Sequence, residues 1–322
     1  MSLLPEKKTP PAQKLTAYHV LIFGESGVGK SSLAAQFPNA LFALTENSTK
    51  AMNVYSVNIG QKAKQQGKLR WEVFSDLVDE FIEGEHDFET LVIDTEDNLY
   101  DDCLEYITQQ LGDHPGSLDD FGASWSKLKE EFIRPHALIK SNGYGLVSVS
   151  HAKFKEIEDL QGKKRDKLVP SVGGSSSEYL IDDSDIVILY DKDNEGNRVL
   201  RVNSDKNFTA KQRISTFPKE PIKAGNSAKE AYENFKSKFD KAIEELNKEL
   251  GITEEMIEDY YARKEEENNK LTFKQLINKV ASKCSDKDIE KKEATKMIMK
   301  EYGKKRFSDL SYEQLEEFYE SL

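Results

Sequence analysis

This sequence of 322 residues has few cysteines and no long apolar run. Its two cysteines, Cys103 and Cys284, lie far apart and form no C-x-x-C spacing, so they indicate ordinary reduced thiols rather than a disulfide or zinc framework. A membrane-spanning helix needs roughly 18 apolar residues in a row, and a signal peptide needs a shorter apolar stretch near its start. Neither pattern occurs, and we therefore expect a cytoplasmic protein without membrane contact.

Apolar residues make up only 37% of the chain, whereas 32% of its residues are charged. A chain of this length still has room for one α/β domain of about 200 residues and a smaller unit. The low apolar content indicates that part of the chain is solvated helix. The net charge of −12 argues against a surface that is basic throughout. It does not exclude nucleic acid as a partner, because a local basic loop suffices for phosphate contacts.

One motif carries most of the functional information. Residues 24–31 read Gly-Glu-Ser-Gly-Val-Gly-Lys-Ser, match G-x-x-x-x-G-K-[ST] in full, and follow the apolar run 19–23. In such a strand-to-helix turn, backbone N–H groups surround the phosphates, the lysine reaches the β- and γ-phosphates, and the serine hydroxyl ligates Mg²⁺. The sequence therefore predicts binding of ATP with Mg²⁺. The expected nucleotide contacts are Gly24, Glu25, Ser26, Gly27, Val28, Gly29, Lys30, Ser31 and Ser32, with Ser31 also a metal ligand.

From residue 17 to residue 221, short apolar runs alternate with amphipathic stretches, which is the pattern of βαβ units around a mainly parallel sheet. The expected strands are 18–23, 40–44, 90–93, 143–150 and 185–190, with a more exposed strand at 198–203 near an edge. The clearest helices are 31–37, 99–110 and 125–140. We expect the last of these to kink or break at Pro135.

Composition changes near residues 221–226, and beyond them almost every stretch is helical. We expect a flexible N-terminal tail (1–16), an α/β core (17–221), and a smaller all-helical C-terminal region (227–322) with a linker near 264–270. The long helix that opens the C-terminal region carries one apolar stripe and ends at Gly251. Such a stripe is more typical of intramolecular core than of a partner site.

Hydrolysis of a phosphoanhydride needs a carboxylate beside the metal and another that orients or deprotonates the attacking water. Asp94 closes an apolar strand and is predicted to bind the metal. Two acids compete for the water. Glu96 lies just past Asp94, but strand alternation should point it the same way as Asp94 and crowd the metal. Glu46 closes the strand after the P-loop helix and would reach the γ-phosphate if that strand lies beside the P-loop strand, so we favour Glu46.

The order of these parts resembles the core of RecA-type recombinases. In that core a P-loop is followed by a strand ending in the catalytic glutamate and by a strand ending in Asp-Ser or Asp-Thr. A further strand ends in a polar sensor residue, and His151 occupies that position after the apolar run that closes at Ser150. The family often has glutamine there, but an imidazole can also donate to a γ-phosphate oxygen and would make the response pH-sensitive. The resemblance implies that Lys30, Glu46 and His151 are catalytic.

Three short segments, 41–46, 150–153 and 210–213, resemble more closely a group of phage-encoded RecA-like ATP-binding proteins associated with single-strand annealing and recombination. The resemblance covers about residues 17–221. It implies a RecA-like P-loop core and a DNA-stimulated ATPase in the host cytoplasm. It also implies a homo-oligomer, ring or filament, that assembles on single-stranded DNA, with a single-strand-binding or annealing protein as a further partner.

A basic stretch follows His151, and it looks too polar and too rich in glycine and serine for regular structure. Loops of this length inside a compact core are usually functional or disordered. In RecA-like proteins the equivalent loop grips the DNA backbone, and Gly173 with Gly174 resembles a glycine pair in it. A solvated surface hairpin is the alternative, because four acids are interleaved with the bases. The candidate DNA-binding residues are Lys153, Lys155, Lys163, Lys164, Arg165 and Lys167.

The resemblance also implies that Lys211 and Arg213 reach into the nucleotide site of a neighbouring subunit and stabilise charge in the transition state. Surface residues without such a role are the alternative. A second hypothesis for the whole chain is a nucleotide-gated, weakly hydrolytic module that recruits a replication or recombination partner through its helical tail. A GTPase is disfavoured because no N-K-x-D motif occurs, and a P-loop kinase because the basic stretch is mainly lysine.

Overall fold

The computed structural model describes residues 7–158, 162, 164–174, 176–269, 273–287 and 289–322. The chain divides into two compact units. The larger unit is Pro11–Gly251, and the smaller one comprises Ile252–Leu322 with the described residues of Met1–Pro10. The larger unit contains every residue that the sequence assigns to nucleotide binding.

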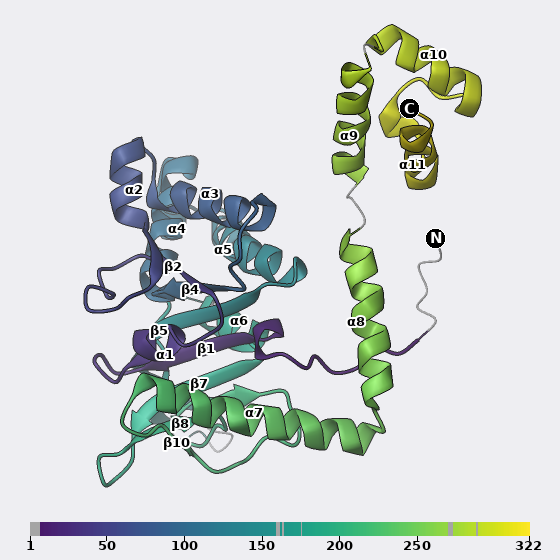
Figure 1. The fold of residues 1–322 in the computed structure, drawn as a ribbon. Coiled ribbons are helices and arrows are strands. Elements are labelled where there is room, and N and C mark those ends of the chain that lie inside the picture. The colour runs from purple at the N-terminus through teal and green to yellow at the C-terminus, as the bar shows by residue number, and fades with distance from the viewer. Residues whose placement is uncertain (1–6, 159–161, 163, 175, 270–272, 288) are drawn as a thin grey trace. The chain divides into compact units, whose positions relative to one another are not determined.

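A twisted sheet forms the centre of the larger unit (Figure 1), with eight of its described strands in the order β10-β8-β7-β1-β5-β4-β2-β3. Off this path, β6 pairs with β5 and β9 pairs with β7. The six strands from β7 to β3 in this order run parallel, whereas β8 and β10 continue the sheet antiparallel. The expected α/β fold with a mainly parallel sheet, followed by C-terminal helices, is thereby confirmed. The strands are β1 (His19–Gly24), β2 (Ala40–Leu44), β3 (Tyr55–Asn58), β4 (Thr90–Asp94), β5 (Gly145–Glu158), β6 (Lys164–Pro170), β7 (Ile186–Lys192), β8 (Arg198–Arg201), β9 (Lys211–Gln212) and β10 (Ile222–Lys223).

Helices cover both faces of the sheet, which explains why its central strands are apolar at nearly every position. Val20 and Ile22 of β1 face the core that α1 and α7 complete. Leu21 and Phe23 alternate with them and face α2 to α6. The helices of this unit are α1 (Lys30–Ala34), α2 (Ile59–Gln66), α3 (Arg70–Glu83), α4 (Glu96–Leu111), α5 (Ala123–Ser141), α6 (Ser176–Asp183) and α7 (Ala228–Leu250).

Helix α5 passes through Pro135 without ending, so the expected break at this residue does not occur. Phe132, Pro135 and His136 are buried on the face of α5 that packs on the core. Burial of this apolar face on both sides of the proline offsets the hydrogen bond that a proline cannot donate.

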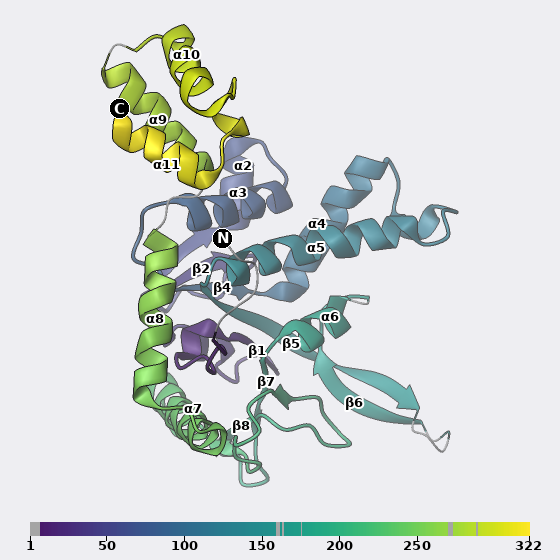
Figure 2. The ribbon, with the colours of Figure 1, turned by 90° about the vertical axis from the view of Figure 1, so that its right-hand side faces the viewer.

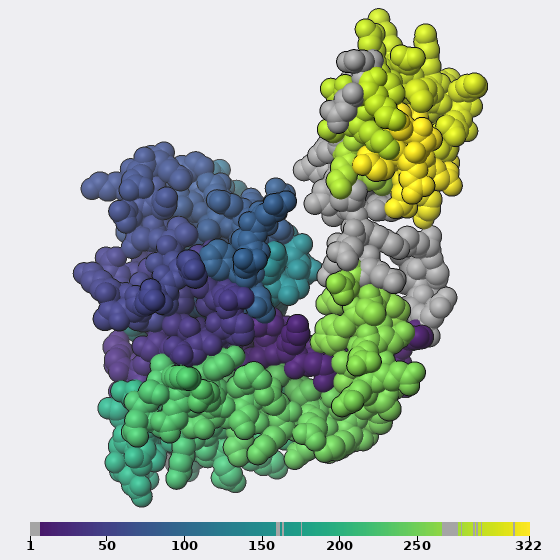
Figure 3. All heavy atoms as spheres, in the orientation of Figure 1, coloured from purple at the N-terminus to yellow at the C-terminus, as the bar shows by residue number. Residues whose placement is uncertain are grey.

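Helix α7 belongs to the larger unit, although its sequence starts the region that we expected to be separate. Ala231, Phe235 and Phe239 of its apolar stripe are fully buried against the sheet. In the space-filling view, α7 lies directly against the core (Figure 3). The chain therefore divides after Gly251, not at residues 221–226.

The smaller unit is helical. It comprises α8 (Glu254–Asn269), α9 (Phe273–Asp286), α10 (Lys291–Tyr302) and α11 (Tyr312–Ser321), and the last three share an apolar core that includes Leu276, Ile298 and Phe318. The stretch expected as a linker is helical up to Asn269, and residue 270 lies outside the described residues. Among the described residues, no helix combines the length and the apolar character needed to cross a membrane.

Candidate active site

The P-loop joins the end of β1 to the start of α1, as the sequence predicts. Two of its glycines have conformations or surroundings that exclude a side chain. A Cβ at Gly24 would lie 2.2 Å from the carbonyl oxygen of Tyr190. Gly29 caps α1 with a φ of 113°, which is left-handed and favours glycine. The turn therefore holds its backbone close against β7. The helix that follows, α1, ends at Ala34 and is shorter than the expected helix 31–37.

Lys30 lies inside this turn rather than in solvent. Its Nζ donates to the carbonyl oxygens of Gly24 and Glu25, each at 2.9 Å. Burial lowers the pKa of Lys30, and the carboxylates of Asp94 and Asp97 oppose that shift. The ammonium group is thus held within the loop that would surround the phosphates of a nucleotide.

Asp94 ends β4 and is fully buried. Its Oδ2 accepts a hydrogen bond from Ser48 Oγ at 2.7 Å, and the hydroxyl of Ser31 also bonds to this carboxyl. Among the described residues, Oδ1 of Asp94 has no partner. Burial raises the pKa of Asp94, because desolvation penalises the charged carboxylate and the positive charge of Lys30 only partly offsets that penalty. A divalent cation would supply both the missing partner and the charge, so Ser31 and Asp94 fit Mg²⁺.

Glu46 reaches the site from a different strand position than we expected. β2 lies between β4 and β3, whereas β1 is flanked by β5 and β7, so the strand that precedes Glu46 does not lie beside the P-loop strand. The turn after β2 nevertheless carries Glu46 to within 3.8 Å of His151, measured from Oε2 to Nε2. Asn98 Nδ2 donates to the same carboxylate at 3.4 Å.

His151 connects this carboxylate to the P-loop. Its Nδ1 lies 3.3 Å from Ser26 Oγ, while its Nε2 faces Glu46. The side chains of His151 and Glu46 are 37% and 36% exposed, so a nucleotide and a water molecule have access to both. The structure thus brings Ser26, His151 and Glu46 together at the carboxyl edge of the sheet.

Asp97 was not identified from the sequence, although it fixes the position of His151. Its Oδ2 accepts from the backbone N–H of His151 at 2.8 Å, and its Oδ1 accepts from Ser150 Oγ at 2.7 Å. Burial raises the pKa of Asp97 despite these two hydrogen bonds. An acid in the first turn of the helix that follows Asp94 is the only sequence signal for this role.

Glu96 points away from the candidate site, contrary to the expectation from strand alternation. β4 ends at Asp94 and Glu96 opens α4, so the alternation of a strand no longer applies at this residue. Its fully buried carboxylate lies 3.0 Å from His136 Nε2 and accepts a hydrogen bond of 2.5 Å from Ser148 Oγ. Burial alone would lower the pKa of His136, but the carboxylate of Glu96 raises it above its ordinary value.

The hydrogen-bond network around Glu96 continues across β5 and β1 to the end of α6. Ser148 Oγ also lies 2.9 Å from His19 Nε2, and His19 Nδ1 lies 3.2 Å from Asp183 Oδ2. Burial lowers the pKa of His19. These bonds tie the first turn of α4 to β5, β1 and the end of α6. They hold in place the turn from which Asp94 and Asp97 project.

The basic stretch after His151 is regular, which corrects the expectation of an irregular loop. β5 extends to Glu158 and pairs antiparallel with β6 in a two-stranded hairpin that projects from the sheet (Figure 2). Lys163 lies outside the described residues. The alternation of apolar and polar residues that indicates a strand is weak here, because both faces of the hairpin carry many polar residues.

The register of the hairpin separates its charges. Lys155 lies opposite Lys167, and Ile157 opposite Arg165, on one face of the hairpin. Glu156 lies opposite Asp166 on the other face. Three of the candidate lysines already have partners: Lys153 donates to the carbonyl oxygens of Ser171 and Val172, Lys155 pairs with Glu178, and Lys164 pairs with Glu156. Arg165 and Lys167 form no ion pair with the described residues, so they are the cations best placed for a ligand.

Gly173 and Gly174 are explained by packing. A Cβ at Gly173 would lie 2.5 Å from the ring of Tyr100, and one at Gly174 would lie 3.0 Å from its hydroxyl. The glycine pair therefore lets the chain pass closely over α4.

Lys211 and Arg213 lie far from the P-loop of their own chain. β1 and β7 run parallel. β9 pairs with the start of β7, whereas the P-loop follows the end of β1, so the two lie at opposite ends of these strands. Lys211 Nζ donates to the carbonyl oxygens of Ile181 and Asp182, and Arg213 pairs with Asp185 at 3.1 Å. Within one chain these two residues do not contribute to the nucleotide site.

Fold and site together define a P-loop ATPase: a mainly parallel sheet presents Lys30, Ser31 and Asp94 at one edge. The chain belongs to the AAA domain family, which matches residues 16–214 and thus most of the larger unit. A KaiC-like protein from the hyperthermophilic archaeon Pyrococcus horikoshii is similar in structure, with a TM-score of 0.34 and 14% identity over 65% of this chain and 85% of that chain. None of the curated proteins matches this sequence.

Proposed function

We propose that this protein hydrolyses ATP and uses the cycle to bind and release single-stranded DNA in recombination or annealing of the phage type. The observation that carries the proposal is the course of β5. His151, which faces the candidate site, and the basic face of the hairpin lie on one continuous strand. A change at the nucleotide can therefore move the hairpin directly.

Each residue of the candidate site has a role in this proposal. Lys30 binds the β- and γ-phosphates, while Ser31 and Asp94 hold Mg²⁺, which would neutralise phosphate charge. Glu46 accepts a proton from the attacking water or orients it, and His151 donates to a γ-phosphate oxygen. Because His151 contacts both Ser26 and Glu46, its movement toward the phosphate would signal the nucleotide state to β5.

The hairpin supplies the DNA contacts of the proposal. Arg165 and Lys167 neutralise phosphates, and Phe154, whose side chain is 73% exposed, is available to stack on a base. Phe154 lies on the opposite face from the two cations, so a strand would have to pass around the hairpin to touch both.

Assembly into a ring or filament would complete the site. Lys211 and Arg213 lie at the edge of the sheet opposite to the P-loop, which leaves them able to approach the nucleotide of a neighbouring subunit. We propose this role for both residues. A single-strand-binding or annealing protein is the further partner that the proposal includes.

The proposal is tested by nucleotide-dependent DNA binding. Fluorescence anisotropy would measure the affinity of the full chain for labelled single-stranded DNA with a non-hydrolysable ATP analogue, with ADP and without nucleotide. We expect tighter binding in the ATP-analogue state, and the same affinity in all three states for Lys30→Ala. Equal affinity of the unaltered protein in all three states would contradict the proposed coupling.

A further inference from the structure

Helix α10 of the smaller unit carries a row of lysines. Lys292, Lys296 and Lys300 are spaced four residues apart and are all exposed. Four residues of α-helix rise about 6 Å and turn about 40° past one full turn. The three lysines therefore form a row about 12 Å long on one side of the helix, which we call the α10 lysine row.

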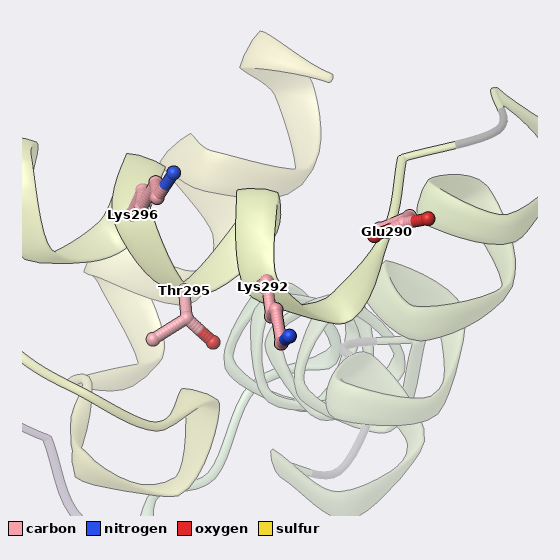
Figure 4. A pocket seen from close by; sticks show the side chains of 4 residues that line it. All are labelled: Glu290, Lys292, Thr295 and Lys296. Carbon is pink, nitrogen blue, oxygen red and sulfur yellow. The ribbon is translucent and has the colours of Figure 1, made fainter.

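The opposite side of α10 is fixed in the core of the unit. Ala294 and Ile298 are buried there, at 2% and 1% exposure, against α9 and α11. At about 100° per residue, these two positions lie roughly opposite to Lys296. The burial of the apolar side therefore turns the α10 lysine row toward solvent. Lys292 and Lys296 line a pocket together with Glu290 and Thr295 (Figure 4).

The cations of this surface are not held in ion pairs with the residues that the structure describes, although Glu290 lines the same pocket as Lys292 and Lys296. Lys292, Lys296 and Lys300 form no ion pair with any described residue, and the same holds for Lys304, Lys305 and Arg306, which follow the end of α10 and are exposed. On α7, Lys229, Lys236 and Lys248 each pair with an acid one turn away, whereas Lys238 and Lys241 form no ion pair with a described residue. Residues 291–306 carry seven Lys or Arg and two Glu, so in a chain with a net charge of −12 this stretch is locally basic.

We propose that the α10 lysine row and the cations 304–306 bind the phosphate backbone of a nucleic acid, as a contact separate from the hairpin. Phosphate contacts require cations that can approach a regular row of charges, and no apolar groove. An acidic protein would need apolar anchors as well. Met299 is the only large apolar side chain on α9 to α11 that stands out as exposed, among the residues described.

Charge-removing variants of the full chain test this proposal. One variant is Lys292→Gln with Lys296→Gln and Lys300→Gln. A second, Lys304→Gln with Lys305→Gln and Arg306→Gln, lies outside the helix and so leaves its folding undisturbed. The matched control removes the same charge from α7 through Lys229→Gln, Lys236→Gln and Lys248→Gln. For each protein, the affinity for single-stranded DNA would be measured by anisotropy over a series of salt concentrations.

We expect each of the two variants to weaken DNA binding and to reduce the slope of log affinity against log salt by about 2, which is 0.7 for each lost single-strand contact. The α7 control should keep the slope of the unaltered protein. An unchanged slope in both variants would overturn the proposal, as would a change in self-association, measured by sedimentation, without a change in DNA binding. In that case the surface would pair with acidic protein, for example with α11 of another copy.

The outcome is distinguishable from failure of the proposed function. That function assigns DNA binding to Arg165 and Lys167 of the hairpin and makes it depend on ATP. The inference for α10 predicts a salt-dependent contact in the absence of nucleotide. A smaller slope in the α10 variants together with an unaffected Arg165→Gln/Lys167→Gln protein would support the inference and contradict the role of the hairpin.

Discussion

His151 is in contact with two groups that come from different parts of the chain, Ser26 of the P-loop and Glu46 after β2. Its backbone N–H is held by Asp97. An imidazole in this position can transmit a change at the γ-phosphate to the strand that carries it, because both ring nitrogens are engaged at the same time. The catalytic assignment depends on Glu46, the acid whose carboxylate the described contacts place beside His151.

Replacing Glu46 with glutamine tests that assignment. We expect Glu46→Gln to keep its affinity for ATP and to lower turnover by about 10²- to 10⁴-fold, because the amide cannot accept the proton of the attacking water. Isothermal titration would measure binding, and steady-state phosphate release would measure turnover. Glu96→Gln is the comparison variant, since Glu96 is the competing candidate and its carboxylate faces away from the site. Loss of turnover with intact ATP binding in Glu96→Gln alone would show that Glu46 is not the water-activating residue.

Glu96 has a structural role that can be measured separately. Removing its charge leaves His136 buried beside an amide, and breaking a buried ion pair costs about 3 to 5 kcal/mol. We expect Glu96→Gln to lower the free energy of unfolding in urea by this amount. Glu178→Gln, which breaks the exposed pair with Lys155, should cost less than about 1 kcal/mol. Equal losses in the two variants would contradict the buried network.

The hairpin of β5 and β6 is the element most directly linked to DNA in this account. Its register places Arg165 and Lys167 on one face and Glu156 and Asp166 on the other. The proposed phosphate contact is therefore specific to one face. Charge-removing substitutions on the basic face can be compared with equal substitutions on the acidic face.

We expect Arg165→Gln with Lys167→Gln to weaken single-strand binding and to reduce the salt slope by about 1.4, which corresponds to two lost contacts. Glu156→Gln with Asp166→Asn, on the opposite face, should leave the slope unchanged. Anisotropy titrations at several salt concentrations measure both. Equal slopes for the two double variants would contradict binding at the basic face.

Elements with strong periodicity were predictable from the sequence, and those with weak patterns were not. The apolar runs that became β1, β4 and β7 and the stripe that became α7 are long and regular, so burial explains them directly. The hairpin was predicted only as the alternative to an irregular loop, because its strands carry many polar residues on both faces. The position of β2 beside β4 depends on long-range pairing, which periodicity does not encode.

Among the site residues, the P-loop was predictable because its chemistry needs one fixed spacing. Lys30, Ser31 and Asp94 lie together as expected. Asp97 was missed because an acid in the first turn of a helix is common, and only its contacts with Ser150 and His151 reveal its role. The predicted orientation of Glu96 was wrong, because β4 ends at Asp94 and Glu96 already belongs to α4.

At the scale of the whole molecule, the proposed role of Lys211 and Arg213 requires that subunits assemble. Lys211 and Arg213 lie at the edge of the sheet opposite to their own P-loop. If they complete the site of a neighbour, turnover per subunit should rise with protein concentration and reach a plateau when assembly is complete. Phosphate release measured over a dilution series tests this. Turnover per subunit that is independent of concentration, in a protein that sediments as a monomer, would contradict a role in trans.

The most direct test of the account is steady-state ATP hydrolysis by the unaltered protein and by Lys30→Ala, each without DNA, with single-stranded DNA and with duplex DNA. We expect hydrolysis that single-stranded DNA stimulates more than duplex DNA does, and no hydrolysis by Lys30→Ala under any condition. Hydrolysis that survives Lys30→Ala would contradict the assignment of the site. Hydrolysis that no DNA changes would contradict its coupling to the hairpin.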